Sequence, residues 1–261
     1  MFKKFKKLTV NTTPCKCCSE TATLYGVVDF NKNCEVQRNK HVLPISGIPV
    51  YYFRCPACQL IFTILFDNFT EQDFLTYIYN GDYILVDPDY VSVRPKSFAE
   101  GITALFSQQK HISILDYGGG NGLLERLLEA SGFSDVDTYD PFSSAYSVKP
   151  NRRYDCIFSF EVFEHSVNPY HTLQEIDSLL KPGGIVIFST LTQPQDIDDM
   201  GLSWWYAGPR NGHVTIHSLQ SLQALAQKFT FTLAHFNSGL HLLFREMPEF
   251  AQHLIRTNSV P

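Results

Sequence analysis

The chain has 261 residues, a length that suits one α/β domain with a small extra module. Its hydrophobic fraction of 44% and charged fraction of 18% are typical of a globular protein, and its net charge of -5 offers no overall basic field for nucleic acid. We therefore expect no nucleic-acid partner. No apolar run reaches the ~20 residues that span a bilayer, so we also expect no membrane span. The basic segment 1–8 lacks the long apolar stretch of a secretory signal, which predicts a cytoplasmic protein with a frayed N-terminal tail.

Paired cysteines dominate the first part of the chain. Cys15 and Cys18, and then Cys55 and Cys58, form two C-x₂-C pairs, and two such pairs can place four thiolates around one zinc ion. In a reducing compartment this spacing favours metal over disulfides. We therefore predict a structural zinc site with these four ligands. Two alternatives stay open at this point, because Cys17 can replace a member of the first pair and Cys34 can enter the site. Ser19 and Gln59 stand where a glycine usually follows each pair.

We predict three regions along the chain: a cysteine-rich, zinc-ribbon-like module over 1–66, a helical connector and possible cofactor lid over 67–108, and an α/β domain over 109–261. Within the connector, the tyrosine-rich stretch 69–90 predicts a helix with loops, and the pattern over 95–108 predicts a second helix. The domain then alternates strands (112–115, 136–139, 156–160, 185–188) with helices (123–130, 170–180, 219–228). Two late strands, 230–235 and 240–245, suit an antiparallel edge.

This alternation predicts a doubly wound, mostly parallel Rossmann-like sheet with helices on both faces. Only residues 141–153 separate the second predicted strand from the next one. A crossover to a parallel strand needs about a dozen residues before the returning strand begins. The third strand and its helix are therefore reduced or missing.

A glycine-rich loop follows the first strand of this domain. The segment Asp116-Tyr117-Gly118-Gly119-Gly120-Asn121-Gly122 lies between a strand and a helix, where glycines let the backbone turn sharply and approach a ligand closely. Ligands of such sheets bind at the carboxyl ends of the strands. The dinucleotide pattern G-x-G-x-x-G does not fit, because residue 123 is leucine. Asp140 ends the second strand, and its carboxylate could accept hydrogen bonds from the two hydroxyls of a ribose.

These motifs together resemble those of class I S-adenosylmethionine-dependent methyltransferases. The spacing D-x-G-x-G-x-G resembles the family's first motif, and the blocks around Glu161–His165 and Leu179–Gly184 resemble its fourth and fifth strands. The resemblance implies the methyltransferase fold and S-adenosylmethionine as cofactor. It also implies cofactor contacts from these residues: Asp116, Tyr117, Gly118, Gly119, Gly120, Gly122, Asp140, Pro141, Phe160 and Glu161.

Methyl transfer needs a positioned acceptor and, for oxygen or nitrogen acceptors, a group that handles a proton. The candidate catalytic residues are Glu161, Glu164, His165 and His213. Their E-x-x-E-H pattern with a later histidine is similar to that of metal-assisted O-methyltransferases, which implies a possible divalent cation at the active site. We favour the metal-free interpretation, in which His165 shapes the pocket or acts as the base.

The acceptor that we expect is a small molecule, a glycan or a sugar nucleotide. Zinc modules of this kind, joined to such methyltransferases, resemble those on bacterial enzymes that modify sugar nucleotides and cell-envelope glycans. Two other classes of function are weighed against this one. The glycine spacing argues against a nicotinamide-dependent oxidoreductase. The presence of Asp116, the glycines and Asp140 argues against a non-catalytic binding protein with a methyltransferase-like fold.

Overall fold

The computed structural model describes residues 11–40 and 43–256, so the basic segment 1–8 lies outside the described residues. The chain divides into two compact units, each built from three stretches of sequence. Unit 1 comprises residues 1–88, 162–172 and 190–228, and unit 2 comprises residues 89–161, 173–189 and 229–261. The linear boundaries at residues 66 and 108 stay a prediction.

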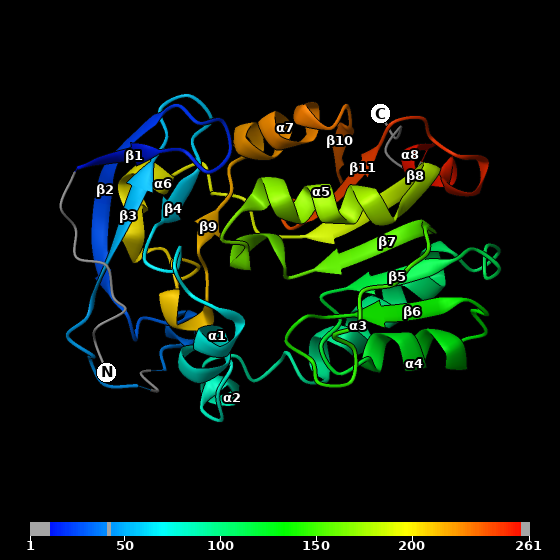
Figure 1. The fold of residues 1–261 in the computed structure, drawn as a ribbon, viewed down its shortest axis with the longest axis horizontal. Helices are drawn as coiled ribbons and strands as arrows, with labels where there is room; N and C mark the ends of the chain where they lie inside the picture. The colour runs from blue at the N-terminus through cyan, green and yellow to red at the C-terminus, as the bar shows by residue number, and fades with distance from the viewer. Residues whose placement is uncertain (1–10, 41–42, 257–261) are drawn as a thin grey trace. The chain divides into compact units, whose positions relative to one another are not determined.

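Unit 2 contains a six-stranded sheet in the order β10-β11-β8-β7-β5-β6 (Figure 1). The strands β8, β7, β5 and β6 run parallel, and β11 and β10 continue the sheet antiparallel. The predicted α/β class and the antiparallel edge are thus confirmed. The strand bounds are β5 Ile114–Tyr117, β6 Val136–Tyr139, β7 Tyr154–Phe160, β8 Leu180–Ser189, β10 Thr232–His235 and β11 Leu240–Phe244.

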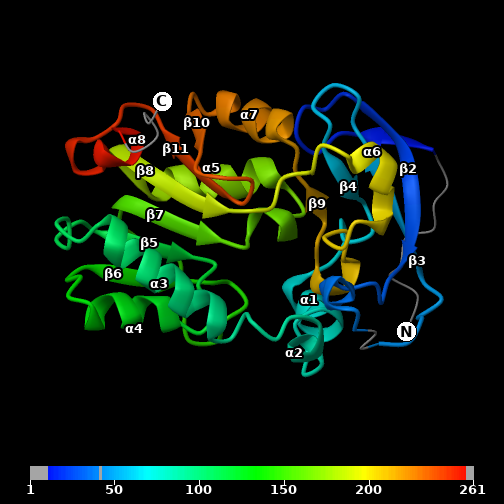
Figure 2. The ribbon, with the colours of Figure 1, turned by 180° about the vertical axis from the view of Figure 1, so that it is seen from behind.

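Helices cover both faces of this sheet. Figure 1 shows α5 in front of the strands, and Figure 2, seen from behind, shows α3 in front of them. On the α3 face, the core joins Ile102 of α3 and Leu128 of α4 to strand residues such as Ile114 and Phe158. The helix bounds are α3 Val93–Leu105, α4 Leu123–Ala130, α5 Pro169–Leu179 and α8 His253–Arg256. The strands β5 and β7 are nearly continuous runs of buried residues, as expected when both faces are covered.

The reduced crossover is also confirmed. After β6 the chain enters β7 directly through residues 140–153, and β6 is the edge of the sheet in the part of the chain that the structure describes. One difference from the prediction lies at β8, which begins at Leu180 rather than at residue 185. The Lys181–Gly184 segment that we expected to end the helix therefore lies within the strand. It forms an irregularity in the β7–β8 pairing, because Tyr154 pairs with Leu180 and Cys156 pairs with Ile185.

Unit 1 contains an antiparallel five-stranded sheet in the order β1-β2-β3-β4-β9. Its last strand comes from the late segment 190–228, with Ile216 paired to Ile61. The sequence predicted only a small ribbon from residues 1–66, so this late strand is a finding of the structure. The bounds are β1 Thr12–Pro14, β2 Thr21–Asp29, β3 Pro49–Arg54, β4 Ile61–Thr63, β9 Thr215–Ile216, α1 Glu71–Tyr77, α2 Tyr83–Val86, α6 Ile197–Met200 and α7 Leu219–Lys228.

The segment 208–213 ties distant parts of unit 1 together through buried polar side chains. Asn211 accepts a hydrogen bond from the Cys34 backbone at 2.8 Å and donates one to the Val86 carbonyl at 2.9 Å. Arg210 donates to the Ile78 carbonyl at 2.8 Å. These bonds fix the predicted connector region, which holds α1 and α2, against the segment that carries His213.

Candidate active site

The glycine loop of unit 2 lies at the carboxyl ends of β5 and β6, where ligands of such sheets bind. Gly118, Gly120 and Gly122 all have positive φ, a conformation that favours glycine. Gly119 is required for a different reason, because a Cβ there would collide with the Asp116 carboxylate and the Thr138 methyl group. The loop backbone therefore packs directly on Asp116 and Thr138, and the Tyr146 ring packs on Gly122.

Asp116 is the acidic residue beneath this loop. Its side chain is only 3% exposed, and its Oδ2 atom has no hydrogen-bond partner among the described residues. Burial, reinforced by the charges of Asp140 and Glu125, raises the pKa of Asp116 to about 8. A buried carboxyl oxygen without a partner costs free energy unless a proton or a bound cation satisfies it. Such an atom against the loop fits the positively charged amino-acid end of S-adenosylmethionine.

Asp140 faces the same loop. Its Oδ2 accepts a hydrogen bond from the Gly120 amide at 2.9 Å, and its Oδ1 accepts one from the Phe142 amide at 2.8 Å. Burial raises the pKa of Asp140, and the two amides partly offset that effect. A carboxylate has about four lone-pair sites, so each oxygen keeps acceptor capacity for a ribose hydroxyl. The geometry thus fits the ribose role that the resemblance implies.

The other residues predicted to contact the cofactor differ in what their side chains do. The buried Tyr117 hydroxyl donates to Glu175 of α5, which leaves only its backbone at the loop. Phe160 stacks on Phe98 of α3 with ring centroids 3.9 Å apart. Pro141 is half-buried directly after Asp140. None of these contacts assigns a ligand, so their cofactor roles stay predictions.

Glu161 directly follows β7 in a left-handed backbone conformation, with φ of 55°. Its amide donates to the Ser189 hydroxyl at 2.8 Å, and the same hydroxyl donates back to Glu161 Oε1 at 2.7 Å. Arg94 Nη1 lies 3.9 Å from Glu161 Oε2. These contacts hold the carboxylate after β7 in unit 2, whereas Glu164, His165 and His213 belong to unit 1.

The structure brings together the other three predicted catalytic residues, all in unit 1. One potential ligand atom from each of Glu164, His165 and His213 lies within 4.8 Å of the others. Glu164 is fully buried and accepts a hydrogen bond from the Tyr206 hydroxyl at 2.7 Å. Gly212 permits this packing, because it has φ of 87° and a Cβ there would lie 3.2 Å from His165 Nδ1.

Hydrogen bonding indicates the tautomer of His213. Its Nδ1 lies 2.7 Å from the Tyr206 carbonyl oxygen, which can only accept, so Nδ1 carries the proton. In the neutral ring Nε2 is then the basic nitrogen. A histidine fixed in this way can take a proton or bind a cation through Nε2.

Four cysteines of unit 1 converge as the spacing predicts. The Sγ separations are 3.5 Å for Cys15 and Cys58, 3.4 Å for Cys18 and Cys55, and 3.6 Å for Cys18 and Cys58. A tetrahedral zinc site with Zn–S bonds of about 2.3 Å places sulfurs about 3.8 Å apart, whereas a disulfide needs about 2.0 Å. The thiol set therefore fits zinc. Cys17 instead donates to the Ser221 carbonyl at 3.2 Å.

The two cysteine pairs form matching turns. In the first, the Cys15 amide bonds the Glu20 carbonyl at 2.8 Å and the Ser19 amide bonds the Cys15 carbonyl at 3.0 Å. In the second, the Cys55 amide bonds the Leu60 carbonyl at 3.0 Å and the Gln59 amide bonds the Cys55 carbonyl at 2.9 Å. Ser19 and Gln59 adopt φ of 69° and 62°, so they take the conformation for which glycine is usual.

Comparison with known proteins decides the family. The model of a family described as a methyltransferase domain matches residues 90–235, more than half of the chain. The chain belongs to this methyltransferase family. The predicted class, an S-adenosylmethionine-dependent methyltransferase, is thereby confirmed.

Individual relatives of this methyltransferase match over shorter stretches. The ubiquinone biosynthesis O-methyltransferase of Rickettsia canadensis (strain McKiel) is 27% identical over 131 residues, covering 42% of this chain and 56% of that protein. Its counterpart in Rickettsia felis is 26% identical over 131 residues, covering 42% of this chain and 54% of that protein. The chain thus spans about half the length of the curated relatives that it matches.

A solved structure shares the fold. The O-methyltransferase family protein from Burkholderia thailandensis superimposes with a TM-score of 0.51 at 12% identity, covering 69% of this chain and 64% of that chain. In addition, no helix among residues 11–40 and 43–256 is long and apolar enough to cross a membrane.

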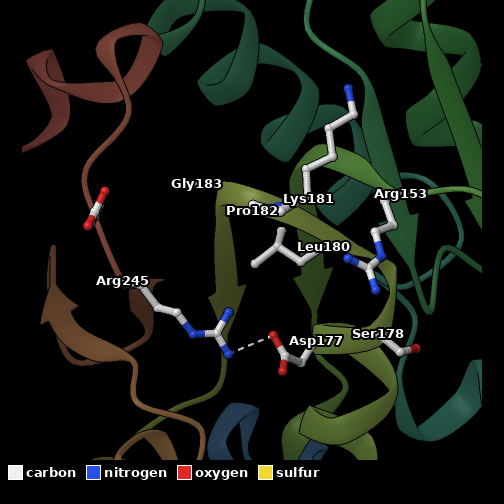
Figure 3. A pocket seen from close by; sticks show the side chains of 9 residues that line it. Arg153, Asp177, Ser178, Leu180, Lys181, Pro182, Gly183 and Arg245 are labelled. Carbon is white, nitrogen blue, oxygen red and sulfur yellow. Dashed lines mark hydrogen bonds and ion pairs between the residues drawn. The ribbon is translucent and has the colours of Figure 1, made fainter.

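The methyltransferase also has a pocket of 490 Å³ in unit 2, lined by residues that include Arg153, Lys181 and Arg245 (Figure 3). Arg153 precedes β7, Lys181 opens β8, and Arg245 follows β11 and pairs with Asp177 at 2.9 Å. These positions are at the amino ends of the parallel strands, opposite the end where cofactors bind. We therefore assign this pocket no role in methyl transfer.

Sequence reasoning missed two polar residues beside Asp116. Thr138 is the register partner of Asp116 on β6, and Glu125 follows the glycine loop on α4. Both carry a buried oxygen with no partner among the described residues. The only available signal was a threonine in a strand and a carboxylate in the first turn of a helix.

Proposed function

We propose that this protein transfers the methyl group of S-adenosylmethionine to an oxygen of a small-molecule acceptor. The observation that carries the proposal is the partnerless Asp116 oxygen beneath a bare glycine loop, with Asp140 beside it. The relatives named O-methyltransferases support oxygen as the acceptor atom. The acceptor class that the sequence suggested, a small molecule, glycan or sugar nucleotide, remains part of the proposal.

When bound, the cofactor supplies an electrophilic methyl group. The chain's own residues then have three tasks. Asp116 and the glycines 118–122 hold the amino-acid end of the cofactor, and Asp140 orients its ribose. His165 or His213 accepts the proton that the acceptor hydroxyl loses. His213 is suited to this because its Nδ1 is committed to the Tyr206 carbonyl, which leaves Nε2 basic.

Calorimetric titration of the full chain tests the cofactor assignment. S-adenosylhomocysteine should bind, NADH and single-stranded RNA should not, and Asp140→Asn should weaken S-adenosylhomocysteine binding at least tenfold, since it loses a charge-assisted acceptor. Binding of NADH in preference to S-adenosylhomocysteine would point to the oxidoreductase class instead.

Variants of the two histidines test the base. His165→Gln and His213→Gln should leave S-adenosylhomocysteine affinity unchanged, and the variant that removes the base should lower the methylation rate by about 10²–10⁴-fold, the usual contribution of general base catalysis. His171→Gln is the matched control, because His171 is exposed on α5. Full activity in both of the first two variants would exclude them as bases.

A metal-assisted version of the same reaction is the second candidate. The gathering of Glu164, His165 and His213 favours it, since two imidazoles and a carboxylate suit a divalent cation. EDTA treatment that leaves the zinc content intact should abolish turnover, and added Mg²⁺ or Mn²⁺ should restore it. Unchanged turnover would leave the metal-free version, which we favour.

We further propose that Cys15, Cys18, Cys55 and Cys58 hold a structural zinc ion. Four thiolates fill its coordination sphere, so it has no open position for substrate. Elemental analysis should find about one zinc per chain, and Cys58→Ser should lose it. Cys17→Ser should keep zinc, because a serine hydroxyl can still donate to the Ser221 carbonyl. Loss of zinc from Cys17→Ser but not from Cys58→Ser would identify Cys17 as a ligand in place of Cys58.

A further inference from the structure

Three acidic side chains gather behind the glycine loop of unit 2. Asp116 lies in β5, Asp140 follows β6, and Glu125 lies in the first turn of α4. We call these three residues the acid cluster. Glu125 is absent from the residues that the family resemblance implied.

Buried oxygens without partners mark the cluster as incomplete in the ligand-free chain. Asp116 Oδ2, Glu125 Oε2 and Thr138 Oγ1 are each buried and lack a hydrogen-bond partner among the described residues. Asp116 and Thr138 are neighbours across the β5–β6 register, and both lie against Gly119. The Asp116 oxygen therefore faces the loop backbone, whereas Thr138 meets Gly119 with its methyl group.

The charges around Asp116 have one sign. Burial and, after it, the like charges of Asp140 and Glu125 together raise the pKa of Asp116 to about 8. The neighbour across the sheet on the other side is apolar, since Phe158 of β7 pairs with Asp116. With no basic group among these neighbours, a proton is the available counter-charge when no ligand is bound.

We propose that the acid cluster holds one proton in the ligand-free chain and releases it to solvent when the ammonium group of the cofactor's amino-acid end binds. The inference rests on the proposed function. In this exchange the Asp116 carboxyl O–H bond breaks, the proton passes to buffer, and the carboxylate pairs with the ammonium, which keeps its own protons. Glu125 is a positioning residue, because it acts on the cofactor through Asp116.

Calorimetric titration with S-adenosylhomocysteine in buffers of different ionisation enthalpy counts the released protons. At pH 7 a carboxyl with a pKa of about 8 is about nine-tenths protonated, so release should be about 0.9 proton per ligand bound. The release should fall below about half a proton above pH 8. Adenosine, which lacks the amino-acid end, should release none.

Variants separate the contributions. Asp116→Asn should bind S-adenosylhomocysteine more weakly, because it lacks the carboxylate that pairs with the ammonium, and should release no proton on binding. Glu125→Gln should still bind it but release fewer protons at pH 7, because loss of a like charge lowers the proton affinity of Asp116. The matched control is Glu129→Gln, an exposed glutamate one turn further along α4, which should release as many protons as wild type.

The possible failures are distinguishable. If wild type does not bind S-adenosylhomocysteine, the proposed function fails and this inference fails with it. If wild type binds but releases no proton at pH 7, or if adenosine releases as many protons as S-adenosylhomocysteine, the proposed function stands and the proton exchange is wrong. Equal release by wild type and Glu125→Gln would remove Glu125 from the cluster.

Discussion

At the scale of single residues, Asp116 should make the stability of the ligand-free protein depend on pH. Its pKa is about 8 in the folded chain and about 3.9 when unfolded, so the folded state alone holds this proton at intermediate pH. The stabilisation is complete below pH 4 and is lost as pH rises toward 8. Between pH 5 and 7 the free energy of unfolding should fall by about 1.4 kcal/mol per pH unit from this group.

Urea unfolding of wild type and Asp116→Asn at pH 5.5, 6.5 and 7.5 isolates this contribution, because all other groups are common to both proteins. As pH rises, the free energy of unfolding of wild type should fall relative to that of Asp116→Asn. Parallel pH profiles would show that Asp116 is ionised in the folded protein, contrary to the raised pKa.

A second residue-scale prediction concerns Gly119. In Gly119→Ala the new methyl group would collide with the Asp116 carboxylate and Thr138, so the loop must shift away from them. We expect S-adenosylhomocysteine affinity to fall at least tenfold. Gly101→Ala is the matched control, since a Cβ there meets nothing within 4 Å. It should leave the affinity unchanged and raise the stability of α3 by about 0.5–1 kcal/mol. Unchanged affinity in Gly119→Ala would argue against close approach of the ligand.

Local motifs made much of the site predictable at this scale. Asp116, Asp140 and the glycines stand at strand ends in fixed spacing, and chain order alone brings strand ends together in a parallel sheet. Thr138 and Glu125 were missed because their roles arise from strand register and helix rotation. Neither is visible in a single sequence without the neighbouring element.

At the scale of elements, the cysteine turns give a prediction about backbone strain. Ser19 has φ of 69°, a conformation that costs a residue with a Cβ roughly 1 kcal/mol. Ser19→Gly should therefore raise the free energy of unfolding of unit 1 by a few tenths to about 1 kcal/mol. Ser19→Ala is the control, since it keeps a Cβ and should give no gain. Thermal unfolding followed by tryptophan fluorescence measures both.

The sequence predicted the bounds of several elements of the α/β domain. The helices at Leu123–Ala130 and Leu219–Lys228 and the strand Val136–Tyr139 begin and end where expected. The predicted start of β8 was wrong. Lys-Pro-Gly-Gly commonly ends a helix, but here it lies within the strand, where the register of β7 and β8 is irregular. The two-residue strand β9 is too short to show any period of its own.

At the scale of the whole molecule, each unit is assembled from three separated stretches of chain. Composition shifts along the sequence can suggest a linear boundary, and the cysteines predict one near residue 66. They cannot show that residues 190–228 return to complete the sheet of the cysteine module, because that pairing depends on contacts such as Ile61 with Ile216. The fold class was readable from local pattern, whereas the division into units was not.

This division predicts that the two proposed ligands act on different parts of the chain. A ligand stabilises the region that holds it, by an amount set by its concentration relative to its Kd. Zinc should protect unit 1, where the four cysteines lie, and S-adenosylhomocysteine should protect unit 2, where the glycine loop lies. Both tryptophans, Trp204 and Trp205, belong to unit 1, so tryptophan fluorescence reports on that unit.

Amide hydrogen exchange and tryptophan fluorescence, both measured on the intact chain, test whether each ligand stabilises its own unit. Removal of zinc by a chelator should speed exchange in β2 and β3 and lower the midpoint of the fluorescence transition, because structural zinc contributes about 10–16 kcal/mol to small modules. S-adenosylhomocysteine should slow exchange in residues 116–123 and at Asp140 without slowing it in β2 and β3. Cys17→Ser should behave as wild type with the chelator. If zinc removal instead speeds exchange in residues 116–123 as much as in β2, zinc also stabilises the glycine loop. The prediction that zinc stabilises unit 1 alone would then be wrong.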